Sequence, residues 1–129
     1  NCEEAFKFYQ SVFGGKLQDL QRFKETPSEG HLPANEGEWL IHVALPIGKD
    51  TILMGSDSPS AMGKVTSGNN FHISIQTDNR EETDRLFNGL AAGGQATLAL
   101  HEASWGSRFG MLVDKFGVQW MVNQVNGQS

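Results

Sequence analysis

Apolar residues recur every three or four positions in two segments of the chain, as they do along one side of an α-helix. Between Asn1 and Gly14 these residues are Cys2, Ala5, Phe6, Tyr9, Val12 and Phe13, and between Asn79 and Gly93 they are Leu86, Phe87, Leu90 and Ala91. Each segment opens with Asn followed three positions later by Glu, and closes at a glycine pair. Because these are typical capping signals, we predict two helices of the same local design.

Three strand-like runs follow each predicted helix in the same order. They cover about residues 16–23, 39–48 and 50–55 in the first half, and 96–101, 108–114 and 117–125 in the second. A further alternating run, residues 70–78, precedes the second helix. The second half therefore predicts β-α-β-β-β, and the first half predicts the same order without its opening strand. We expect that strand to precede Asn1 in the protein or to be supplied by a partner chain.

The repeat predicts an α+β fold of two paired βαβββ modules whose curled mixed sheets form a cup. The predicted boundaries are about 1–57 for module 1, 58–69 for a linker and 70–126 for module 2, within a single domain. One helix covers only one face of each sheet. We therefore expect the uncovered faces of the two sheets to lie side by side and to form a trough between the modules. A trough of this kind suits a small ligand.

Charge and composition exclude several classes of protein. The net charge is −5, and no two Lys or Arg residues are adjacent, so the chain lacks the basic surface that nucleic acids require. No apolar run reaches the roughly 18 residues that would span a bilayer. The single cysteine, Cys2, excludes an internal disulfide and a zinc site of paired cysteines. We expect a soluble, cytoplasmic protein without nucleic-acid or membrane partners.

Three stretches carry a family resemblance: NCEEAFKFYQSVFGGKL at residues 1–17, REETDRLFNGLAAGG at 80–94 and WGSRFGMLVDKFGVQWMVN at 105–123. They resemble the PhnB-like branch of the vicinal oxygen chelate superfamily, which comprises the glyoxalase, bleomycin-resistance and extradiol dioxygenase proteins. The resemblance implies paired βαβββ modules, a homodimer and metal-ligand positions that face the trough. Some members of the branch carry a 3-demethylubiquinone methyltransferase-like label. The chain lacks a strand followed by a Gly-rich loop, so we do not expect methyl transfer.

The residues at the implied metal positions argue against a metal. His72 matches one position, but Met121 and Met54 occupy two others, and the fourth would precede Asn1. A thioether is a poor ligand for a hard divalent ion, so we expect no metal and no other cofactor, with His72 as the remaining candidate ligand. A rival metal-binding set stays open: His42, His72, His101 and Glu102.

The candidate ligand-binding residues are Trp105, Arg108, His72, Met54, Met121 and Trp120. We expect Trp105 and Met121 to line the trough, and we favour a core position for Trp120, Met54 and Phe71. The Arg108 guanidinium, between aromatic residues, could clamp a carboxylate or phosphonate, or it could pair with Asp114 or Glu102.

Three functions fit the sequence, and catalytic residues are not identified for any of them. The first is metal-free binding of a small aromatic or amphipathic ligand in the cup between the modules. The second is a metal-dependent lyase, isomerase or dioxygenase. The third is a structural or interaction module.

Overall fold

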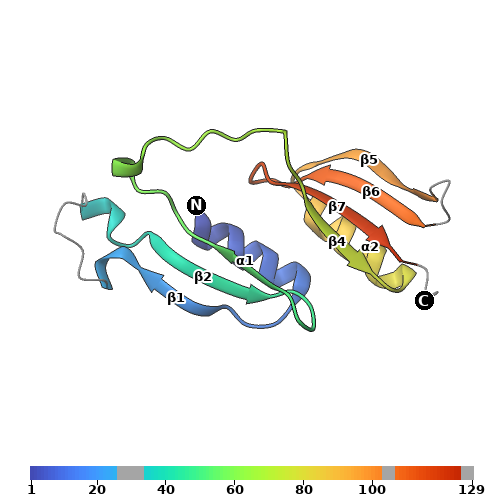
Figure 1. Ribbon diagram of the computed structural model, residues 1–129, viewed down its shortest axis with the longest axis horizontal. Helices are drawn as coiled ribbons and strands as arrows, with labels where there is room; N and C mark the ends of the chain where they lie inside the picture. The colour runs from blue at the N-terminus through green and yellow to red at the C-terminus, as the bar shows by residue number, and fades with distance from the viewer. Residues whose placement is uncertain (26–33, 103–106, 126–129) are drawn as a thin grey trace. The chain divides into compact units, whose positions relative to one another are not determined.

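The chain forms two compact units, Asn1–Thr66 (unit 1) and Ser67–Ser129 (unit 2), each with its own helix and sheet (Figure 1). The structure is a computed structural model that describes residues 1–25, 34–102 and 107–125. In these residues no helix has the length and apolar character needed to cross a bilayer. The fold is mixed α+β with two separate sheets, as the sequence predicts.

Unit 1 consists of one helix and a three-stranded antiparallel sheet of order β1-β2-β3. Its elements are α1 (Cys2–Phe13), β1 (Gln18–Arg22), β2 (Leu40–Pro46) and β3 (Ile52–Gly55), with short 3-10 turns at Phe23–Glu25, Ala34–Glu36 and Ser60–Met62. The predicted apolar side of α1 is buried apart from Phe13, which is half-buried. Phe6 lies so close to β3 that a Cβ on Gly55 would be 2.5 Å from its ring. The helix therefore packs on one face of this sheet.

The start of α1 differs from the prediction, because the Asn1 side chain makes no capping hydrogen bond. The Asp57 carboxylate takes this role: Oδ1 accepts the Cys2 backbone N–H at 3.0 Å, and Oδ2 accepts the Leu40 N–H at 2.9 Å. Burial opposes ionisation of Asp57, but these hydrogen bonds outweigh it and lower its pKa. A residue far along the chain thus caps α1 and joins it to β2.

Unit 2 has the predicted βαβββ order and a four-stranded sheet of order β4-β7-β6-β5. Its elements are β4 (Ile73–Thr77), α2 (Arg80–Ala91), β5 (Gln95–Glu102), β6 (Arg108–Val113) and β7 (Gln119–Gln124). β4 and β7 are parallel, and the other neighbours are antiparallel. At α2 the predicted cap is confirmed, since the Asn79 side chain accepts the Glu82 N–H at 2.7 Å.

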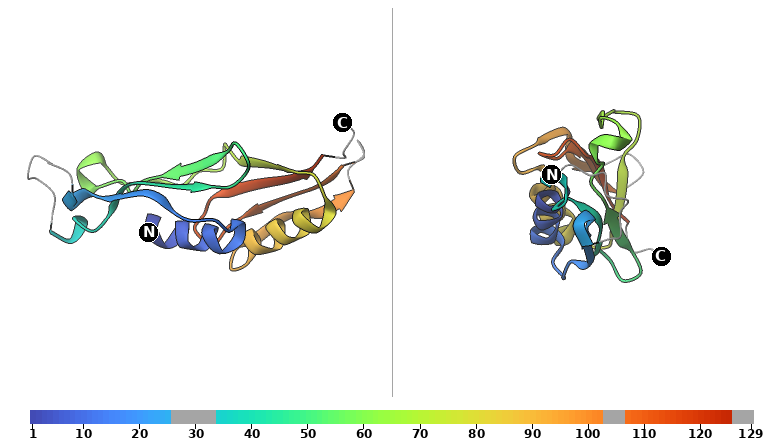
Figure 2. Two further views of the ribbon diagram at one scale, coloured as in Figure 1. Left: turned by 90° about the horizontal axis from the view of Figure 1, so that it is seen from below. Right: turned by 90° about the vertical axis from the view of Figure 1, so that its left-hand side faces the viewer.

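Helix α2 covers one face of the unit 2 sheet, as Figure 2 shows. Leu112, Trp120 and Val122 are fully buried on this face. The ring of Phe87 in α2 lies against β6, where a Cβ on Gly110 would be only 2.7 Å from it. Because neighbouring residues of a strand point to opposite faces, the residues between these buried ones lie on the other face of the sheet.

The turn between β6 and β7 is built around Asp114, which is 3% exposed. Its Oδ2 accepts the Trp120 indole N–H at 2.9 Å, and its Oδ1 accepts the backbone N–H groups of Phe116 and Val118 at 2.8 and 3.0 Å. One carboxylate therefore accepts hydrogen bonds both from the backbone N–H groups of the turn and from a buried indole.

We expect Asp114→Ala to lower the free energy of unfolding of unit 2 by about 3 kcal/mol, because three donors would lose a buried acceptor. Chemical denaturation followed by far-UV circular dichroism measures this. Asp50→Ala, in the exposed turn between β2 and β3, is the matched control and should change stability little. Equal stability of the two variants would contradict the assigned role of Asp114.

A second prediction concerns the ion pair that joins α1 to β1. Both Glu3 carboxylate oxygens accept from the Arg22 guanidinium, at 2.9 and 3.0 Å. This hydrogen bonding is the main reason that the pKa of Glu3 falls from 4.5 to about 2. A lowered folded-state pKa stabilises the protein above pH 4.5, and this stability is lost as the pH falls towards 2.

Glu3→Gln should therefore lower the melting temperature at neutral pH, and the difference from the wild type should shrink towards pH 2. Thermal melts between pH 2 and pH 7 measure it. Glu4→Gln, at the exposed neighbouring position, is the control. A wild-type advantage that stays constant across this range would show that the carboxylate charge is not responsible.

Candidate functional site

The face of the unit 2 sheet that points away from α2 presents a mixed apolar and amide surface, which we call the open face. Strand register arranges it in rows that run across the strands. One row contains Ser74, Met121, Met111 and Leu98, from β4, β7, β6 and β5. The next contains Gln76, Asn123, Phe109 and His101. The third contains Gln119, Val113 and Gln95.

The centre of the open face is apolar, polarizable and only half-buried. Met111 and Met121 are direct cross-strand partners, and Phe109 lies on the same strand as Met111, two residues away. Two thioethers beside an aromatic ring form an adaptable surface for flat or greasy molecules. These rows contain no Asp or Glu, so for hydrogen bonding they offer amides, the Ser74 hydroxyl and the His101 imidazole but no carboxylate.

Met121 lies at the centre of the open face, between Ser74 and Met111, and its contact with a ligand stays a prediction. His72 directly precedes β4 and is half-exposed. Met54 lies on β3 of unit 1 and is 63% exposed, so the alternative that placed it in a core is wrong. The same holds for Phe71, which is also 63% exposed. Trp105 is outside the described residues, and its place in the site stays a prediction.

Trp120 is 0% exposed and belongs to the core of unit 2. It neighbours Met121 in sequence and therefore points to the opposite face of the sheet, where its indole N–H donates to Asp114. Trp120 consequently does not contact a ligand on the open face. The core position that the sequence favoured for Trp120 is confirmed, although Trp120 was also a ligand-binding candidate.

Arg108 also points towards α2 and away from the open face. Its Nε donates to Asp84 in α2 at 2.8 Å, and its Nη1 lies 3.4 Å from the Glu102 carboxylate. The hydrogen bond to Asp84 is the largest cause of the raised pKa of Arg108. The structure thus supports the pairing alternative with Glu102, whereas Asp114 bonds to Trp120 instead. Two carboxylates already engage a guanidinium that is 16% exposed, which weighs against a ligand clamp.

The rival metal set does not assemble within unit 2. β4 and β5 are the two outer strands of the four-stranded sheet, so His72 is separated from His101 and Glu102 by three strand spacings, about 14 Å. His101 Nδ1 lies 2.9 Å from the Ala99 carbonyl oxygen. In unit 1, His42 Nδ1 lies 3.1 Å from the Asp19 carbonyl oxygen. His42 is thus a hydrogen-bonded residue of β2.

The residues at the metal positions that the resemblance implies fit a divalent ion poorly. Met121 has Ser74 and Met111 as its cross-strand neighbours, so a sulfur atom and a hydroxyl are the donors nearest to it in the sheet. Within the described part of either unit, no three His, Cys, Asp or Glu side chains gather as a metal site would require. Such a donor set suits an organic ligand better than a hard cation.

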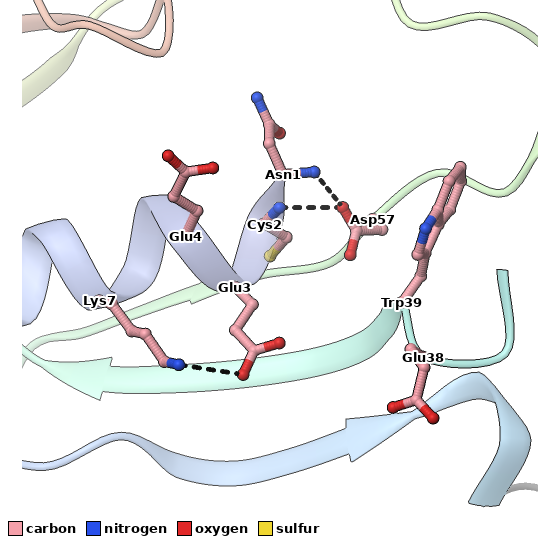
Figure 3. Close-up of a pocket in the computed structure, with 8 residues that line it drawn as sticks. All are labelled: Asn1, Cys2, Glu3, Glu4, Lys7, Glu38, Trp39 and Asp57. Carbon is pink, nitrogen blue, oxygen red and sulfur yellow. Dashed lines mark hydrogen bonds and ion pairs between the residues drawn. The ribbon is translucent and has the colours of Figure 1, made fainter. Parts of the chain in front are cut away.

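Unit 1 contains an open depression of about 420 Å³ at the N-terminal end of α1 (Figure 3). It is lined by Asn1, Cys2, Glu3, Glu4, Lys7, Glu38, Trp39 and Asp57. Burial is the main reason that the pKa of Cys2 rises to about 11, so its thiol stays protonated at neutral pH and is a poor nucleophile. The carboxylates of Glu3 and Asp57 are engaged by Arg22 and by backbone N–H groups. The visible role of this region is to hold α1.

A second depression, of about 500 Å³, adjoins the Val113 and Gln119 end of the open face. Ser67, Gly68, Asn69 and Gly117 complete its lining. Gln119 Nε2 donates to the Phe71 carbonyl at 2.7 Å and so holds this segment beside the sheet.

The sequence analysis missed Phe109, Met111 and Asn123 of the open face. Alternation within the predicted strands 108–114 and 117–125 is the signal that could have placed them beside Met121.

The comparisons with known proteins agree with this architecture. The family model described as the Glyoxalase/Bleomycin resistance protein/Dioxygenase superfamily matches residues 1–122. Protein YjdN of Escherichia coli K12 is 32% identical over 99% of this chain and 90% of its own length. The crystal structure of PA1353 from Pseudomonas aeruginosa has a TM-score of 0.85 at 36% identity, covering 98% of this chain and 90% of that one.

A PhnB protein from Bacillus cereus has a TM-score of 0.74 at 26% identity, covering 96% of this chain and 91% of that one. It supports the PhnB-like resemblance seen in the sequence. With the family model matching nearly the whole chain, the protein belongs to the glyoxalase/bleomycin resistance protein/dioxygenase superfamily.

Proposed function

We propose that the protein binds a small aromatic or amphipathic molecule without a metal, and that the open face of unit 2 is a binding surface for it. The observation that carries this proposal is the cross-strand pair Met111 and Met121, half-buried beside Phe109. Sulfur and aromatic groups attract flat ring systems by dispersion and by sulfur–aromatic contacts. Amide side chains at both ends of the strands supply hydrogen bonds that can orient the ligand.

The family by itself does not choose between binding and catalysis, since its description includes resistance proteins and dioxygenases. The chemistry of the open face favours binding. A metal-dependent lyase, isomerase or dioxygenase would need several oxygen or imidazole ligands around His72, whereas the nearest row holds Ser74, Met121 and Met111. Cofactor-free binding is accordingly the function we propose.

We also propose that the protein is a cytoplasmic homodimer. The dimer follows from the family resemblance, and the single buried cysteine suits a reducing compartment. Analytical ultracentrifugation of the full chain would distinguish a dimer from a monomer.

Met121→Ala should weaken the binding of indole, used as a small aromatic probe, by about two- to tenfold, because one sulfur–aromatic contact is lost. Titration followed by 1H–15N NMR measures the affinity and locates the site through the amides of β6 and β7. Met62→Ala, at a methionine of unit 1 that is 77% exposed, is the matched control and should leave the affinity unchanged. Chemical-shift changes confined to other helices or strands would refute this site. Equal losses of indole affinity in the two variants would also refute it.

Metal analysis tests the metal-free part of the proposal. We expect purified protein to contain far less than one divalent ion per chain, and indole binding to survive treatment with a chelator. His72→Ala should leave the metal content unchanged. One tightly held divalent ion per chain that disappears in His72→Ala would instead favour the metal-dependent enzyme.

A further inference from the structure

Asn123 is the side chain on the open face whose hydrogen bonding is incomplete. Its Oδ1 is buried and has no hydrogen-bond partner, the sole such side-chain atom among the residues that the structure describes. A buried carbonyl oxygen without a partner loses its bonds to water and gains none in return. Native structures rarely keep such a group unless it serves a purpose.

The position of Asn123 in the sheet makes this oxygen relevant to a ligand. Asn123 lies on β7, two residues from Met121, and its cross-strand neighbours are Phe109 and Gln76. The residue as a whole is half-buried, so part of its side chain reaches the surface. The terminal torsion of an Asn side chain is roughly two-fold, so a half-turn that exchanges the amide nitrogen and oxygen can turn the oxygen to the open side.

The same row combines this amide with an aromatic platform. Phe109 is half-buried and makes an edge-to-face contact with His101, with 6.3 Å between ring centroids. Neighbouring strands lie about 5 Å apart, so a flat ring over Phe109 would place its edge above Asn123. An amide acceptor beside an aromatic face suits a planar ligand with a donor on the ring edge.

We propose that Asn123 is the hydrogen-bonding residue of the open face and that it selects planar aromatic ligands carrying a ring N–H or a phenolic O–H. The ligand packs on Phe109 and the two methionines and donates its hydrogen bond to the Asn123 amide oxygen. This inference rests on the proposed binding function and narrows its ligand class. A site that hydrogen-bonds a ligand donor discriminates against the analogue that lacks the donor, because the acceptor is then left unpaired.

The test uses two probes that differ in one donor: indole, which has a ring N–H, and 1-methylindole, which does not. Wild-type protein should bind indole more tightly by about three- to tenfold, the gain from one hydrogen bond. Asn123→Leu and Asn123→Ala remove the acceptor and should abolish this preference. Asn123→Asp keeps acceptor oxygens at the same place and should retain it. Affinities come from NMR titration of the full chain.

Matched variants separate this role from a structural one. Met121→Ala should weaken the binding of both probes by the same factor and leave the ratio of the two affinities unchanged. The reason is that it removes a packing contact and no hydrogen bond. Asn123→Leu should melt at or above the wild-type temperature, since it removes a polar atom that has no partner. A marked fall in its melting temperature, with both probes weakened equally, would show that Asn123 is only structural.

The remaining outcomes distinguish this inference from the proposed function. If wild-type protein binds both probes at β6 and β7 with the same affinity, the role of Asn123 is refuted and the binding function stands. If neither probe perturbs the open face, the proposed function fails and this inference fails with it. Loss of the preference in Asn123→Asp would likewise refute an acceptor role.

Discussion

A single helix covers only one face of each sheet, and the functional argument depends on this constraint. In unit 2, α2 buries Leu112, Trp120 and Val122, and the intervening residues of the same strands must point the other way. Their side chains are half-buried and include Phe109, Met111, Met121 and Asn123. A surface that is apolar at its centre, and that α2 does not reach, is the natural place for a ligand.

Two kinds of residue line the open face. The methionine pair offers soft, adaptable contact area but no hydrogen bond. Asn123 and Gln76 offer hydrogen bonds but little contact area. Polar groups orient a ligand while apolar area supplies most of its affinity, so both rows enter the proposal of a planar ligand with a donor at its edge. Neither row has the carboxylate or imidazole set that holds a catalytic metal.

Each unit packs one helix on one sheet, but the two helices are capped by different hydrogen bonds. In unit 2 the cap of α2 is local, from Asn79 to the Glu82 amide, whereas α1 depends on Asp57 from beyond β3. Asp114 binds the turn before β7 to the indole of Trp120 and thereby fixes which face that ring occupies. Buried carboxylates of this kind are stable only when every oxygen finds donors, so they also fix the register of the strands around them.

The sequence alone determined both helices and the succession of strands along the chain, because periods of 3.6 and 2.0 residues are local properties of the chain. The family came from the resemblance of three stretches and not from periodicity. The sequence also named Met121 as a ligand-binding candidate, which stays a prediction. Tertiary structure decided which aromatic and charged residues lie on the open face: Trp120 belongs to the core, and Arg108 binds Asp84 of α2. Asn123 could be identified only from its buried oxygen without a hydrogen-bond partner. Hydrogen-bond partners come from other strands, so no local sequence pattern indicates whether one is missing.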